Sequence, residues 1–193
     1  MLVGFSGSSC SGKTSLVNRL YEILKSKGYD VAMINDVARW VFNRYFSKYG
    51  TLDELRKDSK AYLRFQEKVF DEQLFLETEL THQYEIVLSD RTLFDNILYT
   101  IVYCDFKDVY HFFMSHSPID SSWYDIIFLC EPLLNEDCND GFRSQSDFYA
   151  RFYHYKLLQN WIGRWGNVIV LKGDLDLEER CKVALKHIKR CLK

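Results

Sequence analysis

The sequence predicts an α/β protein with a mainly parallel, five-stranded sheet and helices on both faces, a three-layer sandwich. Two observations lead to this fold class. Short apolar runs alternate with stretches of helical periodicity along the 193 residues, which is typical of βαβ units. In addition, a glycine-rich loop at residues 7–14 stands directly between the first apolar run and the first helical pattern.

The five expected strands are short apolar runs bounded by polar or turn residues. They cover residues 2–5, 31–34, 86–90, 125–130 and 168–171. Apolar runs of about four to eight residues are typical of strands buried in a parallel sheet. Because parallel neighbours need crossover connections, the segments between these runs are expected to be largely helical.

Helical patterns do fill most of those segments. The first has apolar residues at i, i+1, i+4, i+7 and i+8 from Leu16 and ends near Gly28. Further helices are expected over residues 37–49, 53–83, 93–103, 148–165 and 177–191, with a less regular stretch around residues 110–113.

A single domain, residues 1–193, is the economical interpretation of the length. No internal repeat or flexible linker divides the chain, and its 47% hydrophobic content suffices for a packed core. Within this domain we expect a helical, substrate-binding insertion at about residues 37–84 and a lid at about residues 135–165.

The net charge and the hydropathy of the chain disfavour some classes of function. The net charge of −2 argues against a protein that mainly coats nucleic acid, although a local basic groove is compatible with it. No run of about 18 apolar residues is present, and the first strand begins at Leu2 without room for a removable targeting peptide. We therefore expect a soluble, cytoplasmic protein without a membrane span, with its six cysteines as free thiols.

The glycine-rich loop reads Gly-Ser-Ser-Cys-Ser-Gly-Lys-Thr and fits the phosphate-binding P-loop pattern G-x-x-x-x-G-K-[ST]. Between a strand and a helix, the backbone N–H groups of such a loop point at an anion. Lys13 would reach the β- and γ-phosphates of a nucleotide, and the Thr14 hydroxyl would hold Mg²⁺. An ordinary glycine-rich turn is the structural alternative. The expected nucleotide contacts are Gly7, Ser8, Ser9, Cys10, Ser11, Gly12, Lys13, Thr14 and Ser15.

Two aspartates follow expected strands at the edge where open parallel sheets bind ligands. Asp90 ends an apolar run, as a Walker B aspartate does, and could hold Mg²⁺ beside Thr14 or cap the next helix. Asp36 could accept the proton of an attacking hydroxyl or cap the helix that follows it. Arg39 could bind a substrate phosphate or ribose, or form a surface ion pair.

Two arginines follow the fourth strand. Phosphoryl transfer spreads negative charge over the transferring group, and Arg143 and Arg151 could meet that charge from a lid. The alternative is that both are solvated side chains.

Two glutamines lie seven residues apart in a helical stretch. Gln66 and Gln73 therefore share a face with Tyr62, Phe70 and Glu77. Amides can read the edge of a base, but ordinary packing beside a polar surface is the commoner reason for such a stripe.

Several motifs, taken in chain order, resemble one family. Besides the P-loop, they are Asp36-x-x-Arg39, Ser89-Asp90-Arg91-Thr92, Glu131-Pro132, Asp140-Gly141-x-Arg143, and Gly173 ahead of Glu179-Arg180. Over nearly its whole length the chain resembles the AAA-like P-loop nucleoside and nucleotide kinases. It is most similar to the nicotinamide riboside kinase domain of bifunctional NAD-biosynthesis regulators and, more distantly, to thymidylate kinases.

The resemblance implies a P-loop NTPase sandwich, with ATP and Mg²⁺ as cofactors and phosphate transfer to a small acceptor. By that similarity, Arg91 lies with Asp90 near the metal and the acceptor, and Gly173 lies near the adenine. Asp36 matches the acidic position after the second strand, where Glu is common, and Arg143 matches a lid arginine. The Asp at position 36 leaves the identity of the acceptor open.

We therefore interpret the chain as an ATP-dependent kinase that transfers the γ-phosphate to a hydroxyl or phosphate of a nucleoside- or nucleotide-type acceptor. Nicotinamide riboside, a deoxynucleoside and a deoxynucleoside monophosphate are candidate acceptors. A kinase acting on a polynucleotide or on a hydroxymethylated base in DNA is an alternative, with Trp40 and Tyr45 stacking on the base, but the net charge does not favour it. A nucleotide-binding regulatory switch ATPase is an alternative of another class. A homodimer is compatible with the sequence.

Overall fold

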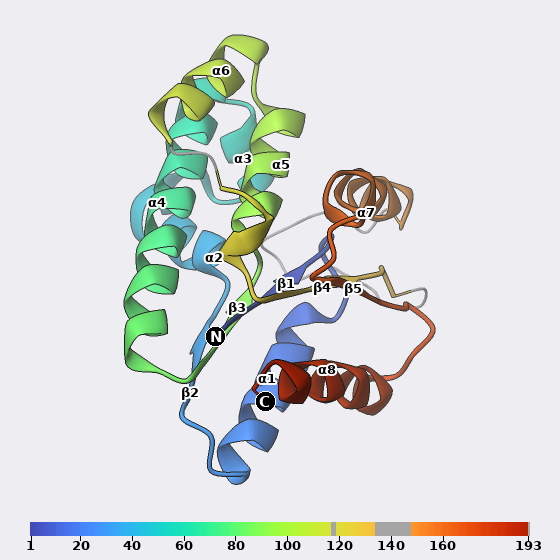
Figure 1. The fold of residues 1–193 in the computed structure, drawn as a ribbon. Coiled ribbons are helices and arrows are strands. Elements are labelled where there is room, and N and C mark those ends of the chain that lie inside the picture. The colour runs from blue at the N-terminus through green and yellow to red at the C-terminus, as the bar shows by residue number, and fades with distance from the viewer. Residues whose placement is uncertain (117–118, 134–147, 193) are drawn as a thin grey trace.

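The computed structural model describes residues 1–116, 119–133 and 148–192. At its centre is a parallel five-stranded sheet with the strand order β2-β3-β1-β4-β5 (Figure 1). The predicted α/β fold class, with helices on both faces of such a sheet, is therefore confirmed. The strands are β1 Leu2–Ser6, β2 Val31–Ile34, β3 Ile86–Asp90, β4 Ile126–Cys130 and β5 Val168–Leu171.

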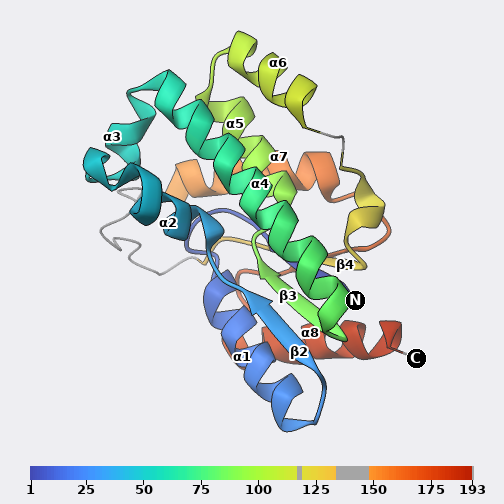
Figure 2. The same ribbon diagram turned by 90° about the vertical axis from the view of Figure 1, so that its left-hand side faces the viewer.

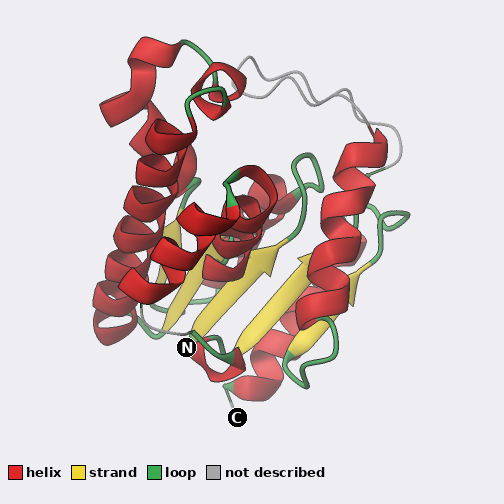
Figure 3. Ribbon diagram, turned by 90° about the horizontal axis from the view of Figure 1, so that it is seen from above, coloured by secondary structure: helices red, strands yellow, loops and turns green. Residues whose placement is uncertain are grey.

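The register of the sheet brings the ends of its central strands together. Phe5 in β1 pairs with Asp90 in β3 on one side and with Phe128 in β4 on the other. The chain therefore leaves these parallel strands at the same edge of the sheet, toward which the strand arrows point (Figure 3). This is the edge at which open parallel sheets bind ligands.

Two apolar cores fill the layers on either side of the sheet. On one face, α1 (Lys13–Ser26) and α8 (Leu177–Cys191) pack against inward-facing strand residues such as Val3, Phe5 and Leu88. On the other face, α4 (Ser59–Gln83), α5 (Leu93–Tyr103) and α7 (Phe148–Ile162) cover the sheet (Figures 1 and 2). Each strand of the sheet's interior is thus covered on both faces, which explains its continuous apolar run.

The segment after β2 departs from the single helix expected over residues 37–49. It forms α2 (Val37–Val41), then a π-helix (Phe42–Phe46), then a 3₁₀ turn (Ser47–Tyr49). Phe42 and Phe46 both pack edge-on against Phe65, with ring centroids 6.4 and 5.5 Å away. Aromatic packing against α4 therefore accompanies the local change of helical pitch.

The helix expected over residues 53–83 is in fact two helices. The short α3 (Leu52–Arg56) has Lys57 as its C-cap, and Asp58 then caps α4 by accepting a hydrogen bond from the N–H of Ala61 at 3.0 Å. Residues 106–115, expected to be less regular, form the regular helix α6. These corrections concern pitch and capping, so the order of the elements stays as predicted.

Two further sequence expectations bear on the chain as a whole. Cys104, Cys130, Cys181 and Cys191 are free, but Cys10 takes part in a disulfide, so the expectation of free thiols is wrong at Cys10. In the part of the chain that the structure describes, no helix combines the length and the apolar character needed to cross a membrane.

Gly4 in β1 permits the close approach of β1 to the start of α5. A Cβ at this position would lie 2.6 Å from Cγ2 of Thr92 and 2.9 Å from the ring of Tyr124. We expect Gly4→Ala to lower the free energy of unfolding by about 1–3 kcal/mol, because buried neighbours must shift. Chemical denaturation measures this, with Gly166→Ala as control, since no heavy atom lies within 4 Å of a Cβ there. Equal stability of the two variants would contradict the packing argument.

Candidate functional site

The P-loop joins β1 to α1 with a backbone that favours glycine. Gly7 and Gly12 have φ values of 142° and 74°, and Cys10 also has a positive φ of 54°. A Cβ on Gly7 would lie 2.6 Å from the carbonyl oxygen of Cys130, so β4 leaves no room for a side chain. The loop therefore takes its shape from the two glycines and from the neighbouring strand.

Buried polar groups line this loop. The hydroxyls of Ser6, Ser8 and Ser9 are buried, and none has a hydrogen-bond partner within the described residues. Lys13 donates from Nζ to the carbonyl oxygens of Gly7 and Ser8 at 2.9 and 2.5 Å. Unpaired buried hydroxyls are costly, so a cradle of this kind fits an oxygen-rich anion such as a phosphate chain.

Lys13 is 5% exposed, and its surroundings disfavour its charge. Burial and then the nearby Arg91 guanidinium lower the pKa of Lys13 to about 8, against the opposing effect of Asp90 and Asp95. Additional negative charge at the loop would favour the protonated lysine. The electrostatics of the loop thus also fit a phosphate ligand.

The Thr14 hydroxyl and Asp90 meet at the entrance to α1. Thr14 Oγ1 donates to Oδ2 of Asp90 at 2.5 Å. Burial raises the pKa of the Asp90 carboxyl, while Lys13 and the Thr14 hydrogen bond lower it. Two oxygen ligands of this type suit Mg²⁺, so the pair predicted for the metal is brought together and fits it. Asp90 does not cap α5, because Thr92 does.

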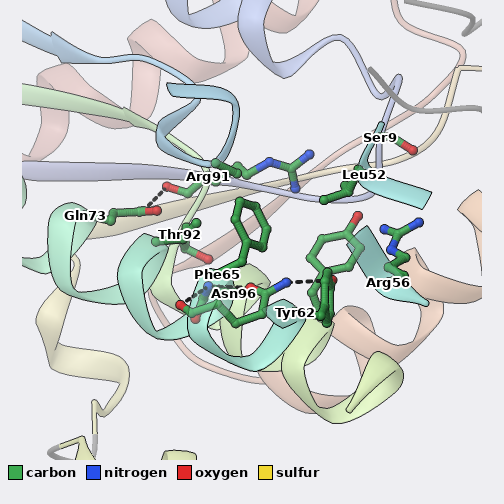
Figure 4. Close-up of a pocket in the computed structure, with 13 residues that line it drawn as sticks. Ser9, Leu52, Arg56, Tyr62, Phe65, Gln73, Arg91, Thr92 and Asn96 are labelled. Atoms are coloured by element: carbon green, nitrogen blue, oxygen red, sulfur yellow. Dashed lines mark hydrogen bonds between the residues drawn. The ribbon is translucent and has the colours of Figure 1, made fainter. Parts of the chain in front are cut away.

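Arg91 has an unusual backbone and a buried side chain. Its φ is 100°, a left-handed conformation that non-glycine residues rarely adopt. Its guanidinium lies over Tyr99, 5.5 Å from the ring centroid, and 3.7 Å from Oδ1 of Asp95. The side chain thereby faces a pocket between the P-loop and the helices α3, α4 and α5 (Figure 4).

This pocket extends from Ser9 in the P-loop to α3, α4 and α5. Its wall combines three aromatic rings, three amides and two guanidinium groups, and no described lining residue is a carboxylate. The cavity that remains free is small, about 40 Å³, which is room for roughly three waters. Side chains must therefore yield before a larger ligand enters. The residues in question are Tyr62, Phe65 and Tyr99; Gln66, Gln73 and Asn96; Arg56 and Arg91.

The backbone carbonyl of Gln66 determines how the side-chain amides of Asn96 and Gln66 are oriented in the pocket wall. Asn96 Nδ2 donates to the carbonyl oxygen of Gln66 at 3.1 Å, which fixes the orientation of the Asn96 amide. The same nitrogen donates to Oε1 of Gln66 at 2.6 Å, so Gln66 Nε2 donates to Tyr62 at 2.6 Å. Asn96 Oδ1 is left buried with no partner in the described chain. Sequence reasoning placed Gln66 and Gln73 together but missed Asn96.

Asp36 and Arg39 lie at the end of β2. The Asp36 carboxylate caps α2 by accepting a hydrogen bond from the N–H of Arg39 at 3.2 Å. Asp36 is also near enough to Asp90 and Arg91 to act on the pKa of both groups. Arg39 is half-buried on α2 and is not part of the pocket wall. The structure thus brings Asp36 to the site and keeps Arg39 beside it.

The remaining predicted residues lie on different elements. Arg151 is buried on α7, and Arg143 lies outside the described residues. Gly173 donates its N–H to Oε2 of Glu131 at 3.0 Å, and Ser15 is exposed in the first turn of α1. Arg180, which the sequence analysis did not single out as a site residue, donates to the carbonyl oxygen of Ser11 at 2.6 Å and so ties α8 to the P-loop.

Asp95 is the most consequential residue that sequence reasoning missed. Its Oδ1 accepts the N–H of Gly7 at 3.0 Å, and its Oδ2 accepts the N–H and hydroxyl of Thr92 at 2.9 and 2.6 Å. Thr92-x-x-Asp95 matches the capping-box pattern, so a helix start at Leu93 was recognisable from the sequence. The bond to Gly7 spans 88 residues, and local sequence carries no signal for it.

These features define a P-loop nucleotide-binding fold with an adjoining pocket. A family model described as "AAA domain" matches residues 2–180, so the chain belongs to this AAA-domain family. No curated protein sequence matches the chain. The predicted resemblance to P-loop kinases is confirmed at the level of family and fold.

Solved structures of similar fold include three of deoxyadenosine kinase from M. mycoides. One holds the products dCMP and a flexible dCDP (18% identity, TM-score 0.64), one dCTP (17%, 0.64) and one dATP (16%, 0.58). Each comparison covers 98% of this chain and 100% of the kinase. At such identities the likeness shows the fold.

Lys13 should give stability a specific dependence on pH. Its pKa falls from 10.5 to about 8 on folding, so between these values the unfolded chain binds a proton that the folded chain lacks. The folded state is therefore penalised below about pH 8, and the penalty is relieved as the pH rises to about 10.5. Relative to Lys13→Met, wild type should gain up to about 3 kcal/mol of unfolding free energy over this window. Urea unfolding at a series of pH values tests this, and a constant difference would contradict it.

Asp95→Asn should loosen the P-loop. An asparagine amide nitrogen would have to face the N–H of Gly7 or of Thr92, leaving a buried donor unpaired at about 1–3 kcal/mol. We expect lower stability together with weaker ATP binding, measured by denaturation and calorimetric titration. Asp176→Asn is the matched control, because Asp176 forms the exposed capping box of α8 and asparagine caps equally well. An unchanged ATP affinity in Asp95→Asn would refute the link to the loop.

Proposed function

We propose that this protein is an ATP-dependent kinase that phosphorylates a hydroxyl of a nucleoside bound in the pocket beside the P-loop. The observation that carries the proposal is the continuity of the two sites. Ser9 of the P-loop and Arg91 beside the Thr14–Asp90 pair both line the pocket. A hydroxyl held there would lie next to the end of a triphosphate, as direct transfer requires.

The chemistry of the pocket favours a neutral, aromatic acceptor. Aromatic rings and amides suit a base, whereas the guanidinium groups of Arg56 and Arg91, with no described carboxylate in the wall, disfavour a cationic pyridinium ring. Nicotinamide riboside is therefore a poorer candidate than an ordinary nucleoside. The structural neighbours are named as deoxyadenosine kinases, which supports the same class of acceptor.

The unpaired acceptor in the pocket favours one type of base. Asn96 Oδ1 needs a donor, and an exocyclic amino group supplies one, whereas a keto oxygen at the same place would face it with a second acceptor. Gln66 holds Asn96 in this orientation. We therefore propose adenine- or cytosine-type nucleosides over thymine- or hypoxanthine-type ones.

We assign the chemical roles as follows. Lys13 and the loop N–H groups bind the phosphates, while Thr14 and Asp90 would hold Mg²⁺, which supplies charge neutralisation when bound. Asp36 orients the acceptor hydroxyl and takes its proton. Arg151, with Arg143 in the proposed lid, stabilises charge on the transferring group. The helices of the insertion supply the walls of the acceptor pocket.

The test incubates the protein with γ-labelled ATP and Mg²⁺ against four deoxynucleosides, inosine, nicotinamide riboside, nucleoside monophosphates, and plain and hydroxymethylated DNA. We expect label on deoxyadenosine or deoxycytidine in preference to thymidine and inosine. Asp36→Asn should lower kcat about 10²- to 10⁴-fold, as loss of a general base does. ATP binding should persist in this variant, because asparagine still caps α2.

Other outcomes would redirect the proposal. Label on DNA alone would favour the polynucleotide kinase, although Trp40 and Tyr45 pack edge-on with each other and under Arg44. Tight ATP binding without transfer to any acceptor would favour a regulatory switch. Label on keto bases alone would refute the role given to Asn96.

A further inference from the structure

A buried carboxylate lies beneath the segment that joins β3 to α5. Glu77 on α4 is fully buried, and the side chains that the described structure places in hydrogen bonds with it are all neutral. An isolated buried charge is costly unless hydrogen bonds compensate it. Neither the nucleotide site nor the acceptor pocket contains Glu77, so its position calls for another explanation.

Four side-chain donors surround the carboxylate. Ser89 and Gln73 donate to Oε1 at 2.8 and 2.9 Å, and Trp123 donates from Nε1 to Oε2 at 2.8 Å. The Tyr124 hydroxyl lies 2.9 and 3.0 Å from the two oxygens. Burial raises the pKa of Glu77, and the hydrogen bonds from these four groups oppose that effect by favouring the ionised carboxylate.

Three of the four donors lead on to the segment at residues 89–93. Gln73 Nε2 also donates to the carbonyl oxygen of Arg91 at 2.9 Å. The Tyr124 hydroxyl accepts the N–H of Leu93 at 2.8 Å, and Ser89 directly precedes Asp90. Gln73 therefore connects Glu77 to the carbonyl oxygen of Arg91, and Tyr124 connects it to the N–H of Leu93. Trp123 is the exception, since its indole N–H contacts only Glu77.

The segment that these bonds hold is conformationally costly. Arg91 keeps its positive φ of 100°, and such a residue persists only where its surroundings over-determine it. The same residue separates Asp90, bonded to Thr14, from Thr92, bonded to Asp95. Ser89 directly precedes Asp90 in β3, so the hydrogen bond from Ser89 to Glu77 acts next to the residue that meets Thr14.

We infer that Glu77 is a positioning residue for the metal site: its carboxylate gathers Gln73, Ser89 and Tyr124 and thereby holds the strained turn that aims Asp90 at Thr14. The inference rests on the proposed function for the role of Mg²⁺ at Asp90. It assigns no contact between Glu77 and substrate or metal. Partners that orient a metal ligand commonly change metal affinity about 10- to 100-fold when they are replaced.

Glu77→Gln tests the inference because the amide cannot satisfy all four donors. Its nitrogen would face either Nε2 of Gln73, which also donates to the carbonyl oxygen of Arg91, or Nε1 of Trp123, and neither of these nitrogen atoms can accept a hydrogen bond. We measure the Mg²⁺ concentration that half-maximally tightens binding of a fluorescent ATP analogue, which needs no phosphate transfer. Glu77→Gln should raise this concentration about tenfold or more.

Trp123→Phe is the matched control. It removes one donor from Glu77 but leaves the bonds to Arg91, Leu93 and Ser89 in place. Thermal unfolding should show both variants destabilised, whereas the Mg²⁺ midpoint of Trp123→Phe should stay within about twofold of wild type. A midpoint that is unchanged in both variants would make Glu77 a core residue only and would overturn the inference.

A second variant covers the case in which Glu77→Gln does not fold. Ser89→Ala removes the 2.8 Å hydrogen bond to Glu77 and a long one of 3.4 Å from Gln73 without adding a buried donor, and it should raise the Mg²⁺ midpoint about threefold to tenfold. An unchanged midpoint in Ser89→Ala would then overturn the inference. Wild type that binds no ATP at any Mg²⁺ concentration would contradict the proposed function as well, which separates the two failures.

Discussion

The rest of the site depends on the backbone turn between β3 and α5. Asp90 on one side of it meets Thr14 of α1, and Thr92 on the other side bonds to Asp95, which holds the N–H of Gly7. Arg91 between them points into the acceptor pocket. Three consecutive residues thus connect the proposed metal site, the P-loop and the proposed acceptor pocket. The relative positions of Asp90, Arg91 and Thr92 stay fixed as long as Arg91 keeps its positive φ.

Short-range rules recovered the scaffold well. The strand at residues 86–90, the helix at residues 93–103 and the last helix end where their apolar runs and caps end. The P-loop was recognisable because its pattern, strand and helix are contiguous. The prediction of one helix over residues 53–83 was wrong because a local capping residue interrupts the apolar pattern. Asp58 caps the start of a second helix, α4, at this point.

The candidate site was less accessible from the sequence because its parts meet over long distances. Gln66 and Gln73 were expected on one face of a helix, and they do share it. Their side chains nevertheless have different partners, Asn96 for the first and the carbonyl of Arg91 for the second. The spacing of residues along a helix predicts which of them share a face, but it does not predict which groups of other elements that face contacts. Glu77, too, lay on the predicted stripe without any sign that it gathers the donors around β3.

The two halves of the site differ in how far they are formed before a ligand binds. The P-loop already has its glycine geometry, and its buried hydroxyls, which have no hydrogen-bond partner among the described residues, fit an anion together with Lys13. The acceptor pocket has little free space, about 40 Å³, yet it contains an amide network whose orientation one backbone carbonyl dictates. Rings and guanidinium groups can shift to admit a base, whereas Asn96 cannot flip without facing that carbonyl with its own oxygen. Selectivity among acceptors should therefore reside in the ordered amides, and affinity in the side chains that move.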